Sequence, residues 1–349
     1  MSDLEIPETV QDFHTRLQSL GPVECSRFVS GWGFAIDGAQ FAIAVNESLY
    51  LHVDDNLRSE LQATGSKPFS YSARGQEIVV ERYYSIPANA LEDNDSFQDW
   101  SSKALSSARP QPLSTSENKN RLPVLLVCTS HAALGNTGNA TGVWFAELAM
   151  AYNVFTRAGI PVKIASPAGG EPPTDPGSNS PEYRIPAVIR FEKDKEAVEA
   201  YASTLRLDEI EDCTNYCGTM LIGGHGTMWD FPDNPALENI LTQLVNDNKP
   251  IGAVCHGVAG LLNTNLVTEK SLVFGKKVTS FTNEEEKLIG LTNVVPFLLE
   301  DRLVEDGAQY VSSKPLEPHL IVDGNLVTGQ NPWSTHDVAK AIAGLLSKD

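Results

Sequence analysis

The second half of the chain alternates short, fully apolar runs with stretches that carry apolar residues at helical spacing. The runs LPVLLVCTS, VKIASP, GTMLIGG and IGAVC are typical of buried strands, and KKVTSF follows as a further strand. Helical patterns occupy residues 141–159, 235–248 and 257–263, and a hairpin pattern and a terminal helix close the chain. This alternation predicts an α/β fold, a doubly wound, mostly parallel sheet that helices cover on both faces.

The first part of the chain has a different texture and predicts a smaller α+β domain at residues 1–108. An amphipathic helix pattern over residues 8–21 is followed by two strands around an Asp37-Gly38 turn, which is a strong hairpin signal. Further strands are expected over residues 47–54 and 77–87, and a helix over 96–108. A stretch rich in Ser, Pro and Asn then predicts a linker at 109–121, so the second domain covers 122–349.

Composition limits the partners and the location of the protein. The chain of 349 residues has 26 basic against 45 acidic residues and a net charge of −19, which argues against a nucleic-acid partner. We find no apolar run long enough to cross a membrane and no apolar core of a signal peptide near the N-terminus. Five scattered cysteines fit a reducing compartment, so we expect a cytoplasmic protein with free thiols. Cys213 and Cys217 have a metal-ligand spacing, but no second ligand pair lies nearby, and we expect no metal.

The polar residues that follow the predicted strands point to a catalytic site. Ligands of doubly wound sheets bind beyond the carboxyl ends of the strands. His131, His225 and Cys255 follow three of these strands, and KKVTSF runs into three consecutive glutamates, residues 284–286. We therefore expect Cys, His and Glu side chains to converge at one edge of the sheet.

Cys255 is the candidate nucleophile. It stands where a strand turns into a helix, which is the geometry of a nucleophile elbow, and Gly252 and Gly257 provide small neighbours for the turn. The helix N-terminus and the adjacent His256 favour the thiolate. The alternative is a buried structural cysteine beside a helix-capping histidine.

Two further residues enter the hypothesis with open alternatives. Gly224 lies in the glycine-rich stretch GGHGTMWDF, and its backbone N–H together with that of His256 would form an oxyanion hole, unless the stretch is only a tight turn. Glu147 lies in the otherwise apolar helix pattern WFAELAMAYNVF. The pattern alone favours a solvated Glu147 over a buried one.

Residues from about 122 to the end resemble the DJ-1/PfpI superfamily, and within it the Hsp31-like branch of glutathione-independent glyoxalases and chaperones. The resemblance is carried by TGVWFAELA, VKIASPAGG, GGHGTMWDFPDNPAL, AVCHG, VTSFTNEEE and DGNLVTGQNP, in the order of the family. It implies a flavodoxin-like fold. It also implies the site residues: the nucleophile Cys255, its partner His256, the acidic member Glu286, a glutamate beside the thiol at Glu147, and oxyanion donors at Gly224 and His256. Val258 stands where close relatives often have Pro.

The resemblance implies a glyoxalase III-type lyase (D-lactate dehydratase class) that converts methylglyoxal and related 2-oxoaldehydes to 2-hydroxy acids without a cofactor or metal. A stress chaperone, a redox sensor or a deglycase from the same superfamily are the alternatives. A glutamine amidotransferase is less favoured, because His319 and His336 have no Glu two residues later. Relatives are commonly dimers, so the resemblance also implies a homodimer.

Residues 8–108 resemble the N-terminal domain of TfoX, a bacterial competence regulator. The resemblance rests on RFVSGWGFAIDGAQFAIAVNESLYLHVDD, GSKPFSYSARG and YYSIPANALEDNDSFQDWSSKAL. That family provides no catalytic residues to transfer. The net charge of −8 over residues 1–110 argues against contact with DNA.

Overall fold

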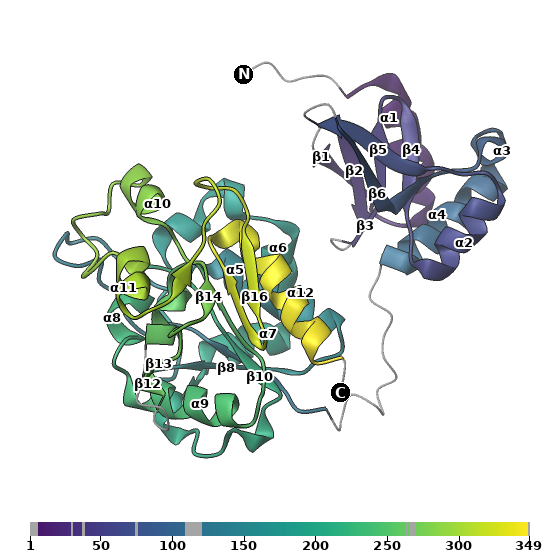
Figure 1. Cartoon of the computed structure of the whole chain (residues 1–349). Coiled ribbons are helices and arrows are strands. Elements are labelled where there is room, and N and C mark those ends of the chain that lie inside the picture. The colour runs from purple at the N-terminus through teal and green to yellow at the C-terminus, as the bar shows by residue number, and fades with distance from the viewer. Residues whose placement is uncertain are drawn as a thin grey trace. The chain divides into compact units, whose positions relative to one another are not determined.

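The computed structural model describes residues 6–28, 31–36, 39–73, 76–108, 121–262, 264–265 and 270–347. The chain divides into two compact units, Met1–Pro112 and Leu113–Asp349 (Figure 1). The predicted Asp37-Gly38 turn lies outside the described residues, as does the predicted linker except for its last residue. Within the described part of the chain, no helix is both long and apolar enough to cross a membrane. All five cysteines are free thiols.

The first unit is an α+β fold built on a six-stranded antiparallel sheet. The strand order is β1-β2-β3-β4-β6-β5. Its elements are α1 (Glu8–Leu17), β1 (Glu24–Phe28), β2 (Gly31–Ile36), β3 (Ala39–Val45), β4 (Ser48–His52), α2 (Asp55–Ala63), β5 (Pro68–Ala73), β6 (Gln76–Ser85), α3 (Ala88–Glu92) and α4 (Asn94–Ala108).

One face of this sheet holds the main core of the first unit. Phe34 and Phe41, from neighbouring strands, are fully buried against Phe13 of α1 and Phe97 of α4. The amphipathic pattern that predicted α1 therefore describes the stripe with which it covers the sheet. β2 and β3 pair antiparallel, as the hairpin signal predicted.

The second unit is built on a seven-stranded sheet in the order β16-β17-β11-β10-β7-β8-β9. All neighbouring pairs are parallel except β16 with β17, the predicted hairpin at one edge. The strands are β7 (Val124–Val127), β8 (Val162–Ser166), β9 (Leu205–Arg206), β10 (Gly218–Leu221), β11 (Ile251–Val254), β16 (Leu320–Asp323) and β17 (Leu326–Gly329).

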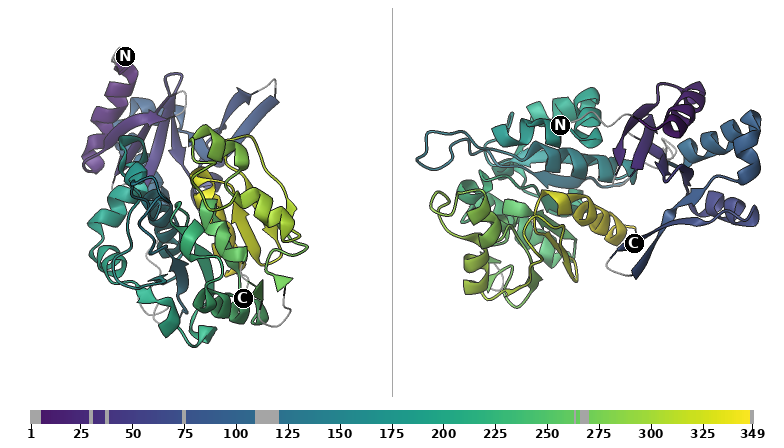
Figure 2. Two further views of the ribbon diagram at one scale, coloured as in Figure 1. Left: turned by 90° about the vertical axis from the view of Figure 1, so that its left-hand side faces the viewer. Right: turned by 90° about the horizontal axis from the view of Figure 1, so that it is seen from above.

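Helices cover both faces of this sheet, as the sequence predicted. Its helices are α5 (Phe145–Arg157), α6 (Pro186–Lys193), α7 (Lys195–Ala202), α8 (Thr227–Asp230), α9 (Pro235–Asn246), the 3₁₀ helix η7 (Cys255–Leu262), α10 (Asn283–Leu288), α11 (Leu299–Glu305) and α12 (Thr335–Leu345). Short 3₁₀ turns lie at Pro176–Asn179, Pro181–Tyr183, Leu207–Glu209, Cys213–Asn215 and Pro332–Ser334. α12 lies beside α5, and both lie on the opposite side of the strands from α9 (Figures 1 and 2).

Strand β7 shows why the apolar runs are uninterrupted. Successive side chains of a strand point to opposite faces of the sheet. Val124 and Leu126 belong to the core under α5 and α12, whereas Leu125 and Val127 belong to the core under α9 and η7. Because both faces are buried, every position of the strand has to be apolar.

The segment KKVTSF differs from its prediction as a strand of the main sheet. Only Lys277–Val278 is extended, as β14, and it pairs with β15 (Gln309–Tyr310) in a separate two-stranded sheet. Another two-stranded sheet joins β12 (Thr264–Asn265) to β13 (Lys270–Ser271). The consecutive polar residues Thr279 and Ser280 are fully buried, and the N–H of Thr279 donates to the side chain of Thr328 on β17. This part of the chain is therefore held against the sheet by side-chain contacts.

Candidate active site

Cys255 lies at the carboxyl end of β11, where the chain turns sharply into η7. Its φ is +56°, in the left-handed region that a non-glycine residue seldom adopts. The 3₁₀ helix begins at Cys255 itself, two residues before the predicted start at Gly257. A Cβ at Gly257 would stand 2.6 Å from the carbonyl oxygen of Leu221, so the turn packs directly on β10. This strained strand-to-helix turn has the form of a nucleophile elbow.

His256 links the thiol to Glu286. Its Nδ1 lies 3.4 Å from the sulfur of Cys255, and its Nε2 lies 2.8 Å from Oε2 of Glu286. A carboxylate only accepts hydrogen bonds, so it selects the tautomer of His256 that has its proton on Nε2. The lone pair of Nδ1 then faces the thiol, and His256 is oriented to accept the thiol proton.

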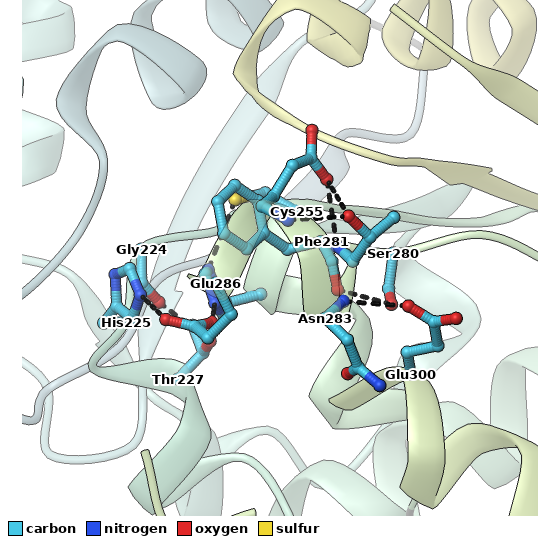
Figure 3. A network of polar contacts seen from close by, with 12 residues as sticks. Gly224, His225, Thr227, Cys255, Ser280, Phe281, Asn283, Glu286 and Glu300 are labelled. Carbon is cyan, nitrogen blue, oxygen red and sulfur yellow. Dashed lines mark hydrogen bonds and ion pairs between the residues drawn. The ribbon is translucent and has the colours of Figure 1, made fainter. Parts of the chain in front are cut away.

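His225, which the sequence placed at this edge of the sheet without a catalytic role, is a member of this group. Its Nε2 donates to the other oxygen of Glu286 at 3.0 Å (Figure 3). Its ring lies 3.9 Å from that of His256, centroid to centroid. The signal was present, because His225 lies four residues after Leu221, the last residue of β10, within the glycine-rich stretch. Glu286 thus orients two imidazoles at once.

Burial and charge fix the protonation of this group. Burial would raise the pKa of Glu286, but the charges and hydrogen bonds of His256 and His225 hold it well below its ordinary value. Burial and the neighbouring His225 lower the pKa of His256, and the nearby Glu286 only partly offsets this. At neutral pH Glu286 is therefore ionised and His256 is neutral, which is the state of a general base.

Glu147 lies on the other side of the thiol and is fully buried in α5. The prediction from the helix pattern alone, which left Glu147 solvated, is wrong. Its Oε2 accepts a hydrogen bond of 2.8 Å from the N–H of Gly223. A Cβ at Gly223 would stand 2.6 Å from that oxygen and 2.8 Å from the Cβ of Cys255, so a glycine is required between carboxyl and thiol. Burial raises the pKa of Glu147 to about 8, although hydrogen bonds from Gly223 and Cys255 oppose the shift.

The thiol of Cys255 is not the readily ionised group that the helix N-terminus suggested. Burial raises its pKa well above the ordinary value, and the negative charge of Glu147 raises it further, whereas the backbone N–H of His256 lowers it. Desolvation outweighs the few dipoles at the helix start. Since Glu147 is largely protonated at neutral pH, its charge is absent there, and the thiol transfers its proton as it attacks.

The two predicted oxyanion donors lie at the same end of the sheet. The backbone N–H of His256 acts on the sulfur of Cys255, and Gly224 lies beside it with a φ of +115°. A Cβ at Gly224 would stand 2.2 Å from the carbonyl oxygen of Gly142, so this backbone conformation needs glycine. Gly224, Cys255 and His256 line one cavity. Whether they hold an oxyanion stays a prediction.

This cavity has a volume of about 220 Å³ and lies directly over the thiol. Apart from the catalytic group, its walls are mostly aromatic and aliphatic. They include Trp144, Tyr183, Phe281, Leu316, Pro332 and Trp333. The site is therefore a small, mainly apolar chamber with one thiol and two imidazoles.

The three residues His225, His256 and Glu286 also have the donor set of a metal site. Their ligand atoms all lie within 4.8 Å of one another. Two imidazoles and one carboxylate suit zinc or non-haem iron. The same atoms are joined by hydrogen bonds that orient His256 as a base, so we assign no reaction step to a metal.

Comparisons with known families match both units. Residues 139–344 match the DJ-1/PfpI family and residues 15–108 match the TfoX N-terminal domain. Glutathione-independent glyoxalase hsp3101 of Schizosaccharomyces pombe is 32% identical over 232 residues, 62% of this chain and 93% of that protein. Glutathione-independent glyoxalase HSP31 of Saccharomyces cerevisiae is 29% identical over 226 residues, 62% of this chain and 94% of that protein.

Solved structures of the same fold cover the second unit. Rapid Encystment Protein 24 KDa of Francisella tularensis is 39% identical, with a TM-score of 0.61 over 64% of this chain and 98% of that one. Glyoxalase III of Candida albicans is 27% identical, with a TM-score of 0.60 over 64% of this chain and 96% of that one.

Proposed function

The chain belongs to the DJ-1/PfpI family, and we propose that its second unit is a cysteine-dependent, cofactor-free glyoxalase that converts methylglyoxal and related 2-oxoaldehydes to 2-hydroxy acids. The observation that carries the proposal is the placement of Cys255 between two proton carriers of opposite character. His256 is a neutral base on one side, and Glu147 is a largely protonated acid on the other. Relatives that are themselves named glutathione-independent glyoxalases support it.

The first step forms a bond between the sulfur of Cys255 and the aldehyde carbon of the substrate. The thiol proton moves to Nδ1 of His256, 3.4 Å from the sulfur, and the ionised Glu286 stabilises the imidazolium. The aldehyde oxygen becomes an oxyanion near the backbone N–H groups of Gly224 and His256. It then takes the proton back from His256, which leaves a hemithioacetal and a neutral imidazole.

The second step exchanges the oxidation states of the two carbons. His256 removes the hydrogen of the former aldehyde carbon as a proton, while Glu147 gives its proton to the neighbouring ketone oxygen, and an enediol forms. The imidazolium then protonates the former ketone carbon, and the hydroxyl on the first carbon returns its proton to Glu147. The product is a thioester of a 2-hydroxy acid, and no external oxidant or reductant is needed.

Water completes the reaction. His256 takes a proton from a water molecule that attacks the thioester carbon, and the Cys255 sulfur leaves and recovers a proton. With methylglyoxal the net reaction is the addition of one water to give lactate. Every proton transfer uses His256 or Glu147, so the chain's own side chains suffice for the chemistry.

The proposal is tested with the purified full chain, methylglyoxal and no added thiol. We expect the loss of methylglyoxal to be matched by an equal amount of lactate. Addition of glutathione should not raise the rate. Disappearance of substrate without lactate, or only in the presence of glutathione, would overturn the proposal.

The geometry does not favour a redox sensor. Oxidation selects thiols that are exposed and easily ionised, whereas Cys255 is buried and its pKa is raised. Glycated amines have the same reacting carbons as 2-oxoaldehydes, so deglycase activity at this site would be an extension of the same chemistry.

The remaining expectations concern location and partners. The five free thiols fit a cytoplasmic enzyme. The acidic composition of both units disfavours nucleic acid and anionic membrane surfaces as partners. We propose a homodimer as the working assembly, by analogy with the family.

A further inference from the structure

Two surface loops form the mouth of the cavity above Cys255. One contributes Leu316, and the other, directly after β17, contributes Pro332 and Trp333. Leu316 and Trp333 are 45% and 44% exposed, so they stand at the rim, where an entering substrate meets them. Both side chains are large and apolar, although each is open to solvent.

The chamber fits a substrate with a compact apolar group. At about 220 Å³ it lies below the roughly 300–1,000 Å³ of pockets for drug-sized ligands. Among the residues described as lining it there is no Lys, Arg, Asp or Glu. A charged side group on the substrate would lose water there without gaining a partner.

Glu285 connects both loops of the mouth to the catalytic helix. It precedes Glu286 in α10 and is fully buried. Its Oε1 accepts hydrogen bonds of 2.9 Å from the N–H of Leu316 and 2.9 Å from Nδ2 of Asn331, the residue before Pro332. One carboxylate therefore holds one residue of each loop.

The other oxygen of Glu285 holds the start of α10. Its Oε2 accepts from the N–H of Thr282 at 2.9 Å and from the Thr282 hydroxyl at 3.0 Å, which completes a capping box. The same helix start is tied to α11, because the N–H of Asn283 donates to Glu300 at 2.8 Å (Figure 3). Glu285 therefore fixes the two loops of the mouth to the helix that carries Glu286.

The contacts of Glu285 leave little room for another residue type. All four partners act as donors, and among the described residues no Lys, Arg or His forms an ion pair with it. Leu316 has a φ of +63°, which costs energy for a leucine, and its own N–H is one of the four donors. A carboxylate with four acceptor sites matches this environment, whereas an amide would turn N–H groups toward donors.

We propose that this mouth selects 2-oxoaldehydes whose substituent on the ketone carbon is apolar and larger than methyl. Glu285 is the positioning residue that holds the two loops of the mouth in place. The proposal rests on the proposed glyoxalase function. An apolar pocket gains about 10-fold or more in kcat/KM for each methylene that it buries. The wild-type chain should therefore use phenylglyoxal with a kcat/KM at least 10-fold above that for methylglyoxal.

The variant Glu285→Gln tests the role of the carboxylate. Because the amide keeps the shape but loses acceptors, we expect KM for phenylglyoxal to rise about 10-fold while kcat for either substrate changes less than threefold. Glu284→Gln is the matched control, since Glu284 is exposed and adjacent. Glu285→Asp, which keeps the charge, should recover part of the preference. The proposal would be overturned by a wild type that does not prefer phenylglyoxal. It would also be overturned if the ratio of kcat/KM for phenylglyoxal to that for methylglyoxal is unchanged in Glu285→Gln, or if kcat/KM falls equally for both substrates.

A second measurement is independent of turnover. Alkylation of Cys255 by iodoacetamide and by its N-phenyl derivative, followed by mass spectrometry, reports the mouth directly. We expect the ratio of phenyl to plain reagent rates to fall about 10-fold in Glu285→Gln, with the iodoacetamide rate within twofold of wild type. An unchanged ratio would contradict the role of Glu285 even if no 2-oxoaldehyde is turned over.

If Glu285→Gln does not fold, Asn331→Ala replaces it in both measurements. This variant removes only one of the four donors to Glu285. It should lower the kcat/KM ratio of phenylglyoxal to methylglyoxal and the ratio of the two alkylation rates by about threefold each. Ratios within error of wild type would overturn the proposal.

Discussion

The two sides of Cys255 carry buried carboxyl groups whose pKa values move in opposite directions. Glu147 has a single N–H donor from the backbone and an apolar helix around it, and its pKa rises to about 8. Glu286 is also buried, but two imidazoles contact its two oxygens, and its pKa falls. Burial alone therefore does not set the protonation state of a carboxyl group; the neighbouring donors decide it.

This difference in protonation gives the two carboxyl groups different roles beside the thiol. The Glu286 side keeps a permanent negative charge that orients His256 as a base. Glu147 stays protonated and can donate its proton to a substrate oxygen. Substitutions that remove the difference on either side should damage the reaction in distinct ways.

Of the two carboxyl groups, Glu286 on the ionised side should give the larger effect when it is changed, in Glu286→Gln. The amide cannot accept from both imidazoles, so the tautomer of His256 is no longer fixed and the imidazolium loses its counter-charge. We expect kcat for methylglyoxal to fall by about 10²–10⁴-fold, the range for loss of general base catalysis. Steady-state kinetics beside the exposed control Glu284→Gln will measure it, and a loss below fivefold would contradict the role of Glu286.

On the protonated side, Glu147→Gln should lower kcat by about 10²-fold, because the amide cannot exchange a proton with the substrate. It should also change the pH dependence of stability. The folded-state pKa of Glu147 is raised above the unfolded value of 4.5, so the folded chain keeps a proton that the unfolded chain releases. The contribution of Glu147 to the free energy of unfolding is therefore lost as pH rises from about 4.5 to about 8, at up to roughly 1.4 kcal/mol per pH unit.

Urea unfolding at several pH values in this range will compare the two proteins. The difference in midpoint between Glu147→Gln and wild type should grow in favour of the variant as the pH rises. A difference that does not vary with pH would show that Glu147 is ionised in the folded chain.

Part of this site could be predicted from the sequence, because neighbouring residues along the chain determine it. Cys255 follows a short apolar run and precedes small residues, so the strand, the turn and the nucleophile are encoded within a few positions. The strand pattern of β7 likewise reports two buried faces, because each of its residues contacts one of two cores. The resemblance to a known family pointed to Glu147 and Glu286.

Other features depend on contacts between distant segments, and no local pattern reports them. The burial of Glu147 depends on Gly223, which is 76 positions away. Nothing in three consecutive glutamates indicates that Glu285 contacts two loops, that Glu286 contacts two histidines and that Glu284 is exposed. The segment KKVTSF has an apolar-polar texture that suits a strand, yet it lies outside the main sheet, and the backbone N–H of Thr279 donates to the side chain of Thr328 on β17.

The pH profile of the reaction provides a smaller effect. Burial and His225 lower the pKa of His256 below 6.5, so the imidazole stays neutral and active through neutral pH. On the acidic side, we expect kcat/KM to be level near pH 7 and to fall below pH 6.5 as His256 gains a proton. In His225→Asn the fall should begin at higher pH, because the neighbouring ring that disfavours the charged imidazole is gone. A profile that declines from pH 7.5 downward in the wild type would contradict the assignment of His256.

The smallest effect is expected from metal removal. Prolonged treatment with a chelator should leave kcat for methylglyoxal within twofold, because no step uses a metal. A large loss that zinc or iron restores would instead assign His225, His256 and Glu286 to a metal site.

The most direct test of the central claim is lactate formation from methylglyoxal by Cys255→Ala, with Cys217→Ala as the matched control. Cys217 is a free thiol that does not line the cavity. The account predicts that Cys255→Ala forms lactate at least 10³-fold more slowly than wild type, whereas Cys217→Ala keeps the wild-type rate. Lactate formation by Cys255→Ala at the wild-type rate would contradict it.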